Sequence, residues 1–270
     1  MNQPKVTILV PNYRTPEITR ICLRLLRKNT DPSLARVIVI DNDSADESLE
    51  YLRTLRWIDL IERTNVPEEG PAKSHSSALD LALKHVDTPY VLSIHTDTFI
   101  KRPDWLEMLL EPFGMDTRVS GVGSWKLESK PAWKSAGKYI EKGWKDLLGW
   151  VIGKQTYDPV RFDATQHYLR SHCALYRTDI IRQLDTSFGD GGRVAGRIMH
   201  YKMVEAGYRM VFLPSERLGV YLDHLNHATM VLNPELGSSA SSVREGRRRI
   251  KKKMRGIDAL EILSDESLDR

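Results

Sequence analysis

The 270-residue chain has little cysteine and no long hydrophobic run. Two cysteines, Cys22 and Cys173, cannot build a disulfide scaffold or a cysteine zinc site, and they favour a reducing, cytoplasmic location. No apolar run approaches the ~20 residues of a membrane-spanning helix, and the opening MNQPKVTILVP lacks the pattern of a signal peptide. No glycine follows the first expected strand and no P-loop occurs, which argues against dinucleotide-binding and P-loop folds.

Positive charge is confined to one segment. The chain carries a net charge of +4, but REGRRRIKKKMR at 244–255 alone carries +7, so the remaining residues sum to 4 − 7 = −3. A mildly acidic body is not suited to gripping nucleic acid over a broad face, and nucleic acid is not an expected partner. The basic segment needs an explanation of its own.

The hydrophobic pattern predicts strands that alternate with helices. VTILV at 6–10 is apolar without alternation, which is typical of a strand covered on both faces. Further strands are expected at 36–40, 59–63 and 90–94, with amphipathic helices at 17–28, 47–55 and 74–85. This order predicts an α/β fold in which a parallel sheet is flanked by helices.

Polar residues follow each expected strand. Such sheets bind ligands at the carboxyl ends of their strands, so a functional site is expected there. Turn chemistry alone could explain any single cluster, but four in succession favour a site. The clusters are Pro11-Asn12-Tyr13, Asp41-Asn42-Asp43, Thr64-Asn65 and His95-Thr96-Asp97.

Three segments, taken in order, resemble the nucleotide-sugar domain of family 2 glycosyltransferases of the GT-A fold. They are KVTILVPNYRTPE, ARVIVIDNDSADES and PYVLSIHTDTFIKRPDWLEMLL. The resemblance covers residues 4–113 and resumes at 171–177 and 206–214. It implies a Rossmann-like, mostly parallel sheet in a domain spanning 1–236, with a nucleotide-sugar half (1–113) and an acceptor half (114–236). A linker and a basic C-terminal helix are expected at 237–270.

The resemblance assigns donor-binding roles to residues near the strand ends. It implies that Pro11 and Tyr13 line the base pocket and that Asp41, followed by Asn42, accepts the imide hydrogen of uracil. Lys73 stands near an expected helix N-terminus, where it either faces the donor diphosphate or is simply solvated.

The family's Asp-x-Asp element is His95-Thr96-Asp97 in this chain. The resemblance implies that Asp97 ligates a divalent metal, Mn²⁺ or Mg²⁺, that bridges the phosphates, and that His95 and Thr96 contact the donor. Imidazole suits Mn²⁺ better than Mg²⁺, although His95 would alternatively bond the ribose or a metal-bound water. His224 occupies the place of a second metal ligand and is preferred to His227; surface or acceptor roles remain open for both.

The catalytic base has no clear candidate at the family position. An inverting transferase needs a carboxylate to deprotonate the acceptor hydroxyl. The family's Glu-Asp pair falls on Ala195-Gly196, and the nearest carboxylate is Asp190 in the glycine-rich FGDGG. Asp190 is therefore either the base or an ordinary turn residue.

The acceptor site is expected where the resemblance lapses, between residues 123 and 163. This stretch holds four of the six tryptophans. Trp125 and Trp133 lie among polar residues and are predicted to pack against an acceptor sugar, because an aromatic face suits sugar C–H groups. His172 is either an acceptor contact or a packed histidine.

The expected activity is metal-dependent, inverting transfer of a hexose-type sugar from a nucleoside diphosphate, UDP in the first instance. The acceptor is a saccharide or a lipid-linked saccharide, in polysaccharide or glycoconjugate synthesis. The alternative is a nucleotide-sugar-binding protein without catalysis.

The basic segment leaves three interpretations open. It follows a serine run, 238–242, that is interpreted as a linker. A helix packed on the domain or on a second copy is preferred, followed by contact with the inner face of a membrane, and then by nucleic-acid binding.

Overall fold

The computed structural model describes residues 3–64, 70–125, 167–192 and 194–270. The predicted acceptor residue Trp133 lies outside these ranges.

A seven-stranded sheet forms the centre of the molecule. β1 (Val6–Asn12) lies between β2 (Ala35–Asn42) and β4 (Tyr90–Ile94), and the strand order is β3-β2-β1-β4-β7-β6-β8. β1 to β4 are all parallel, whereas β7 runs antiparallel to both of its neighbours. The remaining strands are β3 (Asp59–Arg63), β6 (Val119–Gly123), β7 (Cys173–Arg177) and β8 (Arg209–Phe212). The predicted α/β fold with a mostly parallel sheet is confirmed.

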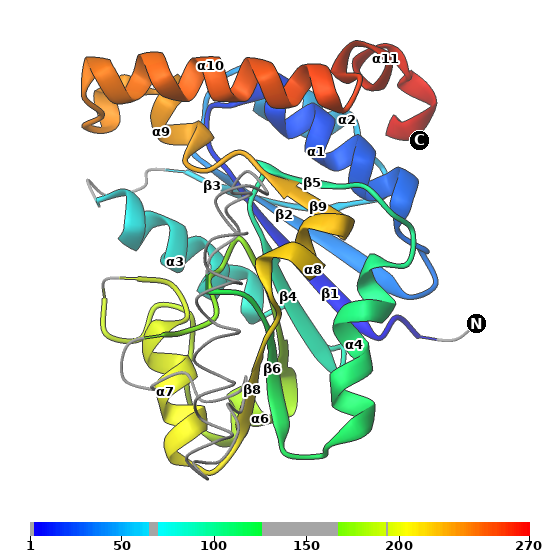
Figure 1. The fold of residues 1–270 in the computed structure, drawn as a ribbon, viewed down its shortest axis with the longest axis vertical. Helices are drawn as coiled ribbons and strands as arrows, with labels where there is room; N and C mark the ends of the chain where they lie inside the picture. Colours follow the sequence, from blue (N-terminus) through cyan, green and yellow to red (C-terminus); the bar gives the residue numbers. More distant parts are fainter. Residues whose placement is uncertain (1–2, 65–69, 126–166, 193) are drawn as a thin grey trace, which may run out of the picture.

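Helices cover both faces of the sheet because its strands are apolar on both sides (Figure 1). Along β1, Ile8 and Val10 join the apolar cluster on one face, while Leu9 joins the cluster on the other. The first face is covered by α1 (Pro16–Asn29), α2 (Glu47–Thr54) and α4 (Trp105–Met115). The second is covered by α3 (Pro71–Leu83), α6 (Thr178–Gln183) and α7 (Arg197–Glu205).

Local signals set where the first helices begin. Proline stands at the start of α1 and of α3, where its missing amide hydrogen costs no helical hydrogen bond. Asp46 caps α2 by accepting a hydrogen bond from the Ser48 amide. Each helix therefore begins just beyond a strand end, which leaves the polar clusters at one edge of the sheet.

A second, two-stranded sheet joins distant parts of the sequence. β5 (Thr98–Ile100) pairs antiparallel with β9 (Leu222–His224), which follows α8 (Ser215–Tyr221). The register places Thr98 opposite His224. His224 is thereby brought beside Asp97, the residue that precedes β5.

The C-terminal helices pack on α1. Their apolar residues form a third cluster with α1 and β5, and α10 lies along one edge of the molecule above α9 and α1 (Figure 1). The elements are α9 (Ala228–Leu232), the 3₁₀ turn η1 (Pro234–Leu236), α10 (Ala240–Gly256), α11 (Ala259–Ser264) and η2 (Glu266–Asp269). No helix in the described ranges is both long enough and apolar enough to cross a bilayer.

The expected serine linker differs from the structure. α10 begins inside the serine run, at Ala240, because the Ser239 side chain accepts a hydrogen bond from the Ser242 amide and caps the helix. Serine at this position therefore caps and starts a helix.

An ion pair between the buried Arg24 and the partly exposed Asp269 joins η2 to α1. Arg24, 2% exposed, donates from Nε to Oδ1 of Asp269 at 2.8 Å and from Nη2 to Oδ2 at 2.5 Å. The Tyr51 hydroxyl donates to the same carboxylate at 2.7 Å. Replacing Asp269 would leave the buried Arg24 guanidinium without its charged partner, which is destabilising.

Candidate active site

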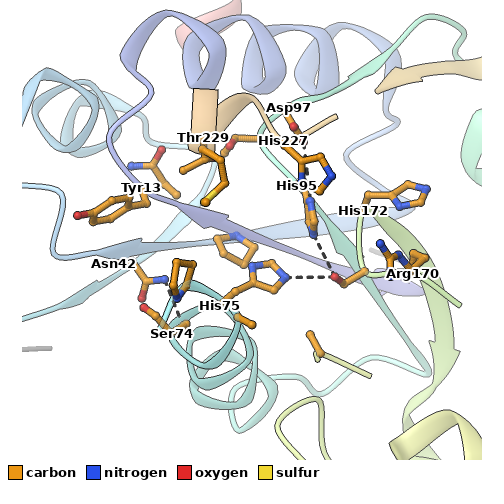
Figure 2. A pocket seen from close by; sticks show the side chains of 18 of the residues that line it. Tyr13, Asn42, Ser74, His75, His95, Asp97, Arg170, His172, His227 and Thr229 are labelled. Atoms are coloured by element: carbon orange, nitrogen blue, oxygen red, sulfur yellow. Dashed lines mark hydrogen bonds and ion pairs between the residues drawn. The ribbon is translucent and has the colours of Figure 1, made fainter. Parts of the chain in front are cut away.

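A pocket of about 690 Å³ opens at the carboxyl ends of β1, β2 and β4. Figure 2 shows Tyr13 and Asn42 on one side of it, His172 and Arg170 on the other, and His95 between them. Five of the chain's eight histidines line the pocket: His75, His95, His172, His224 and His227. The site therefore lies at the sheet edge that the sequence pattern predicts.

One corner of this pocket gathers three residues of the kinds that bind metals, two histidines and one aspartate. His95, Asp97 and His224 each offer a ligand atom, and these atoms lie within 4.8 Å of one another. Nε2 of His224 is 3.1 Å from Oδ1 of Asp97, and Nδ1 of His95 is 3.8 Å from the same oxygen. We call these three residues the metal corner.

Unsatisfied polar atoms show that the metal corner is suited to a cation. Oδ2 of Asp97 accepts a hydrogen bond from the Ala228 amide at the start of α9, at 3.0 Å. Oδ1 of Asp97 and both ring nitrogens of His224 are buried and make no hydrogen bond within the described ranges. Such orphaned atoms are costly, and a shared divalent ion satisfies all three side chains at once. The donor set fits the predicted metal.

The corner also has the protonation state that metal binding requires. Burial alone would favour neutral Asp97, but His224, His95 and the Ala228 amide outweigh it and hold the pKa of this carboxyl far below its usual range. For His95, burial itself lowers the pKa, well below that of a free imidazole. A carboxylate beside neutral imidazole is the ligating form of both groups.

Further histidines brace the metal corner. The His172 ring stacks on His224 with centroids 4.6 Å apart and planes 14° from parallel, and its Nε2 is 3.2 Å from the Ser124 hydroxyl. The Ser171 hydroxyl bridges His95 Nε2 at 3.0 Å and His75 Nε2 at 3.2 Å. Burial lowers the pKa of His75 to about 4, so this ring is neutral near pH 7.

The predicted donor residues divide into two groups. Pro11, Tyr13, Asn42 and Thr96 line the pocket, as do the three metal-corner residues. Asp41 and Lys73 do not. Asp41 is 1% exposed and accepts from the Asn12 amide at 2.7 Å and from the Ser44 backbone amide at 3.0 Å, while Lys73 is exposed at the start of α3. Their donor roles stay predictions.

Aromatic and basic groups form the wall that lies across the pocket from Tyr13 and Asn42 (Figure 2). Trp125 and His172, both predicted acceptor residues, line the pocket there. The Arg170 guanidinium lies 5.2 Å from the Trp125 ring centroid and 5.5 Å from that of Tyr168, whose hydroxyl it contacts at 2.5 Å. This wall offers ring faces and one cation to a ligand.

The position of the family's base carries no carboxylate. Val194 and Ala195 line the pocket there, and the lining carboxylates of the described residues are Asp43 and Asp97. Asp190 is outside the lining: its carboxylate accepts from Lys202 Nζ at 2.8 Å and from the Thr186 hydroxyl at 2.5 Å. This arrangement gives no support to Asp190 as the base, and that role stays a prediction.

Sequence reasoning missed His75, Ser171, Tyr168 and Arg170. His75 lies in the second turn of α3, which begins at the functional edge of the sheet, so its place after β3 is a signal that could have found it. The other three immediately precede β7, whose antiparallel insertion beside β4 brings them to the same edge. The family resemblance resumes at 171–177, but it does not by itself show that this strand inserts beside β4.

Comparison with known proteins places the chain in a family. The model described as "Glycosyl transferase family 2" matches residues 7–185. No curated protein sequence matches the chain significantly.

Solved structures share the fold at low sequence identity. The mannosyltransferase PcManGT from Pyrobaculum calidifontis, in complex with GDP-Man and Mn²⁺, is 19% identical with a TM-score of 0.54, over 78% of this chain and 55% of that one. S. aureus TarS 1–349 is 16% identical with a TM-score of 0.52, over 77% and 58%. The same TarS fragment with UDP gives 16% and 0.51, over 77% and 57%. The chain thus spans a little over half the length of these structures.

Proposed function

We propose, on the premise that the chain belongs to glycosyl transferase family 2, that its pocket binds a nucleoside diphosphate sugar together with a divalent metal and transfers the sugar to an acceptor. The metal corner is the observation that carries this proposal. His95, Asp97 and His224 would hold the ion, which neutralises negative charge on the departing diphosphate when it is bound.

The donor half of the pocket fits a nucleotide. Tyr13 offers a ring face and Asn42 an amide. Oδ1 of Asn42 accepts a hydrogen bond from Nη1 of Arg63 at 2.5 Å, which orients the amide. One structural relative was solved with GDP-Man and another with UDP. UDP is the nucleotide we propose, with Asp41 accepting the imide hydrogen of uracil in exchange for its hydrogen bond from Asn12.

The acceptor half fits a sugar-containing molecule. Trp125 and Tyr168 meet edge to face with centroids 5.0 Å apart, and Arg170 lies against both rings. An aromatic face packs against sugar C–H groups, and a guanidinium binds hydroxyl or phosphate oxygens. We therefore propose a saccharide or lipid-linked saccharide as acceptor, with a hexose-type sugar transferred.

The metal corner suggests a preference among ions. Two imidazoles and one carboxylate suit a first-row transition metal better than Mg²⁺, which favours oxygen ligands. We propose Mn²⁺ as the working ion.

Calorimetric titration tests the donor site. UDP, GDP and dTDP are titrated with and without Mn²⁺, into the protein and into Asp97→Asn. We expect Mn²⁺-dependent binding of UDP that the variant loses. Asp43→Asn, the other lining carboxylate, is the matched control and should keep metal-dependent binding. Binding of UDP that is equal with and without metal would refute the role of the corner.

A second candidate function rests on the wall that Val194 and Ala195 form. Because no carboxylate of the described residues lines the pocket there, the chain would bind a nucleotide sugar without transferring it. Hydrolysis of UDP-sugars and transfer to a panel of saccharide acceptors distinguish the two functions. Intact Mn²⁺-dependent UDP binding, combined with neither activity, favours the binding protein.

A further inference from the structure

The outward face of α10 carries an unpaired row of positive charge. Its six exposed basic residues make no ion pair or hydrogen bond within the described ranges; they are Arg244, Arg247, Arg248, Lys251, Lys252 and Arg255. We call these six residues the basic stripe. At 3.6 residues per turn they fall within an arc of about 140° and extend about 17 Å along the helix. Glu245 is the one acidic residue of α10.

The opposite face of α10 is fixed to the body of the protein. Ile250 is buried in the third apolar cluster, and Gly246 lies so close to Val231 of α9 that a Cβ there would be 2.3 Å from that side chain. The two basic residues on this face have partners. Arg249 donates to the backbone carbonyls of Leu225 and Asn226, and Lys253 donates to Asp223 at 2.5 Å.

This division determines how the stripe can act. Within the described residues, only the inward cations of α10 contact the body of the protein, and the pocket lining includes no residue of α10. The outward cations are therefore used neither in these contacts nor in the pocket. A rigid row of cations at an edge of the molecule can meet a flat anionic surface while the mildly acidic body remains away from it.

We propose that the basic stripe docks the protein on anionic phospholipid headgroups. The apolar face of α10 is covered by α9 and α11, so docking is electrostatic and does not insert the helix. A lipid surface is favoured over nucleic acid because α10 has no aromatic residue for base stacking and the rest of the protein is mildly acidic. The inference goes beyond the proposed function and does not depend on it.

Vesicle sedimentation tests the proposal with the full chain. Phosphatidylcholine vesicles with about one-third phosphatidylglycerol are compared with phosphatidylcholine alone. Binding is expected for the anionic vesicles and should weaken strongly between about 0.1 and about 0.5 M NaCl. Replacing Arg247, Arg248, Lys251 and Lys252 with Gln should lower the partition coefficient by about a hundredfold or more.

A matched variant separates the stripe from net charge. Lys5, Lys28, Arg56 and Lys84 are exposed elsewhere, have no ion pair in the described part of the chain, and remove the same charge when replaced with Gln. This variant should retain most vesicle binding. Circular dichroism checks that both variants are folded, and the salt dependence of the unaltered protein tests the inference independently of either.

Three outcomes would overturn the inference. One is equal binding to neutral and anionic vesicles. Another is equal loss of binding in the two four-residue variants. The third is a protein that does not bind anionic vesicles but uses the basic stripe for something else. That use would be binding of an RNA oligonucleotide or dimerisation in sedimentation velocity, either of them lost in the stripe variant. UDP titration on the stripe variant should be unchanged, so failure here leaves the proposed donor site untouched.

Discussion

Two parts of the pocket differ in how their polar groups are satisfied. At the metal corner, Asp97 and the half-buried His224 carry buried polar atoms that have no hydrogen-bond partner within the described ranges. Elsewhere in the lining, Val194 and Ala195 present no ionisable group, and Asp190 is paired with Lys202 away from the lining. Unsatisfied buried atoms indicate a place prepared for a ligand, whereas fully paired ones indicate structure.

The largest effect is expected from Asp97→Asn. The substitution removes the one charged ligand of the metal corner while preserving shape, so turnover should fall about a thousandfold and Mn²⁺-dependent UDP binding should disappear. Asp43→Asn should leave metal-dependent binding in place. If both variants behaved alike, the contrast between the corner and the rest of the lining would not hold.

Acid should destabilise the protein through a histidine on the helix that follows Val194 and Ala195. His200 lies on α7, which begins just after Ala195 and Gly196; it is 1% exposed, and burial lowers its pKa to about 4. The unfolded chain therefore binds more protons below pH 6.5, so stability is present above that pH and is lost as pH falls toward 4. The contribution is about 3 kcal/mol.

Urea unfolding at pH 6.5 and pH 4 measures this loss. His200→Gln should remove most of the pH dependence that belongs to this site, whereas His85→Gln, at an exposed position, should not. If the free energy of unfolding depended on pH equally in the two variants, burial would not be what keeps His200 neutral.

His95→Asp sharpens the comparison at the metal corner. A second carboxylate replaces an imidazole and makes the donor set harder, so the ratio of Mg²⁺ to Mn²⁺ affinity should rise about tenfold. Titration of each metal into the two proteins gives the ratio without any assay of turnover. An unchanged ratio would mean that His95 does not ligate the ion.

The smallest effect is expected from Asp190→Asn. Its ion pair with Lys202 is partly exposed, so the loss should be about 1 kcal/mol of unfolding free energy, with turnover changed less than about threefold. Thermal unfolding and initial rates measure the two quantities. A loss of turnover of about 10²–10⁴ with UDP binding intact would instead establish Asp190 as the base and break the comparison.

Much of the fold could be predicted from the sequence because its signals are local. The strands predicted at 6–10, 36–40, 59–63 and 90–94 all occur, and their ends place Tyr13, Asn42 and Asp97 around one pocket. Buried parallel strands are short apolar runs and their polar ends are short clusters, so neither needs knowledge of distant contacts.

What could not be predicted depends on contacts between distant segments. The partnership of Asp97 with His224 follows from the pairing of β5 with β9, and only the family resemblance pointed to it. The bridge from His75 to His95 needs Ser171, which the insertion of β7 beside β4 supplies. The sequence of α10 likewise does not distinguish Lys253, which is paired with Asp223, from the unpaired Lys252.

α9 separates the pocket from α10 by the thickness of one helix. In its five residues, Thr229 and Met230 line the pocket, Val231 meets Gly246, and the Ala228 amide holds Asp97. Leu232, at the end of α9, is 37% exposed. A fluorescent label on a cysteine introduced there would therefore report from one position on two separate events, filling of the pocket and contact of α10 with another surface.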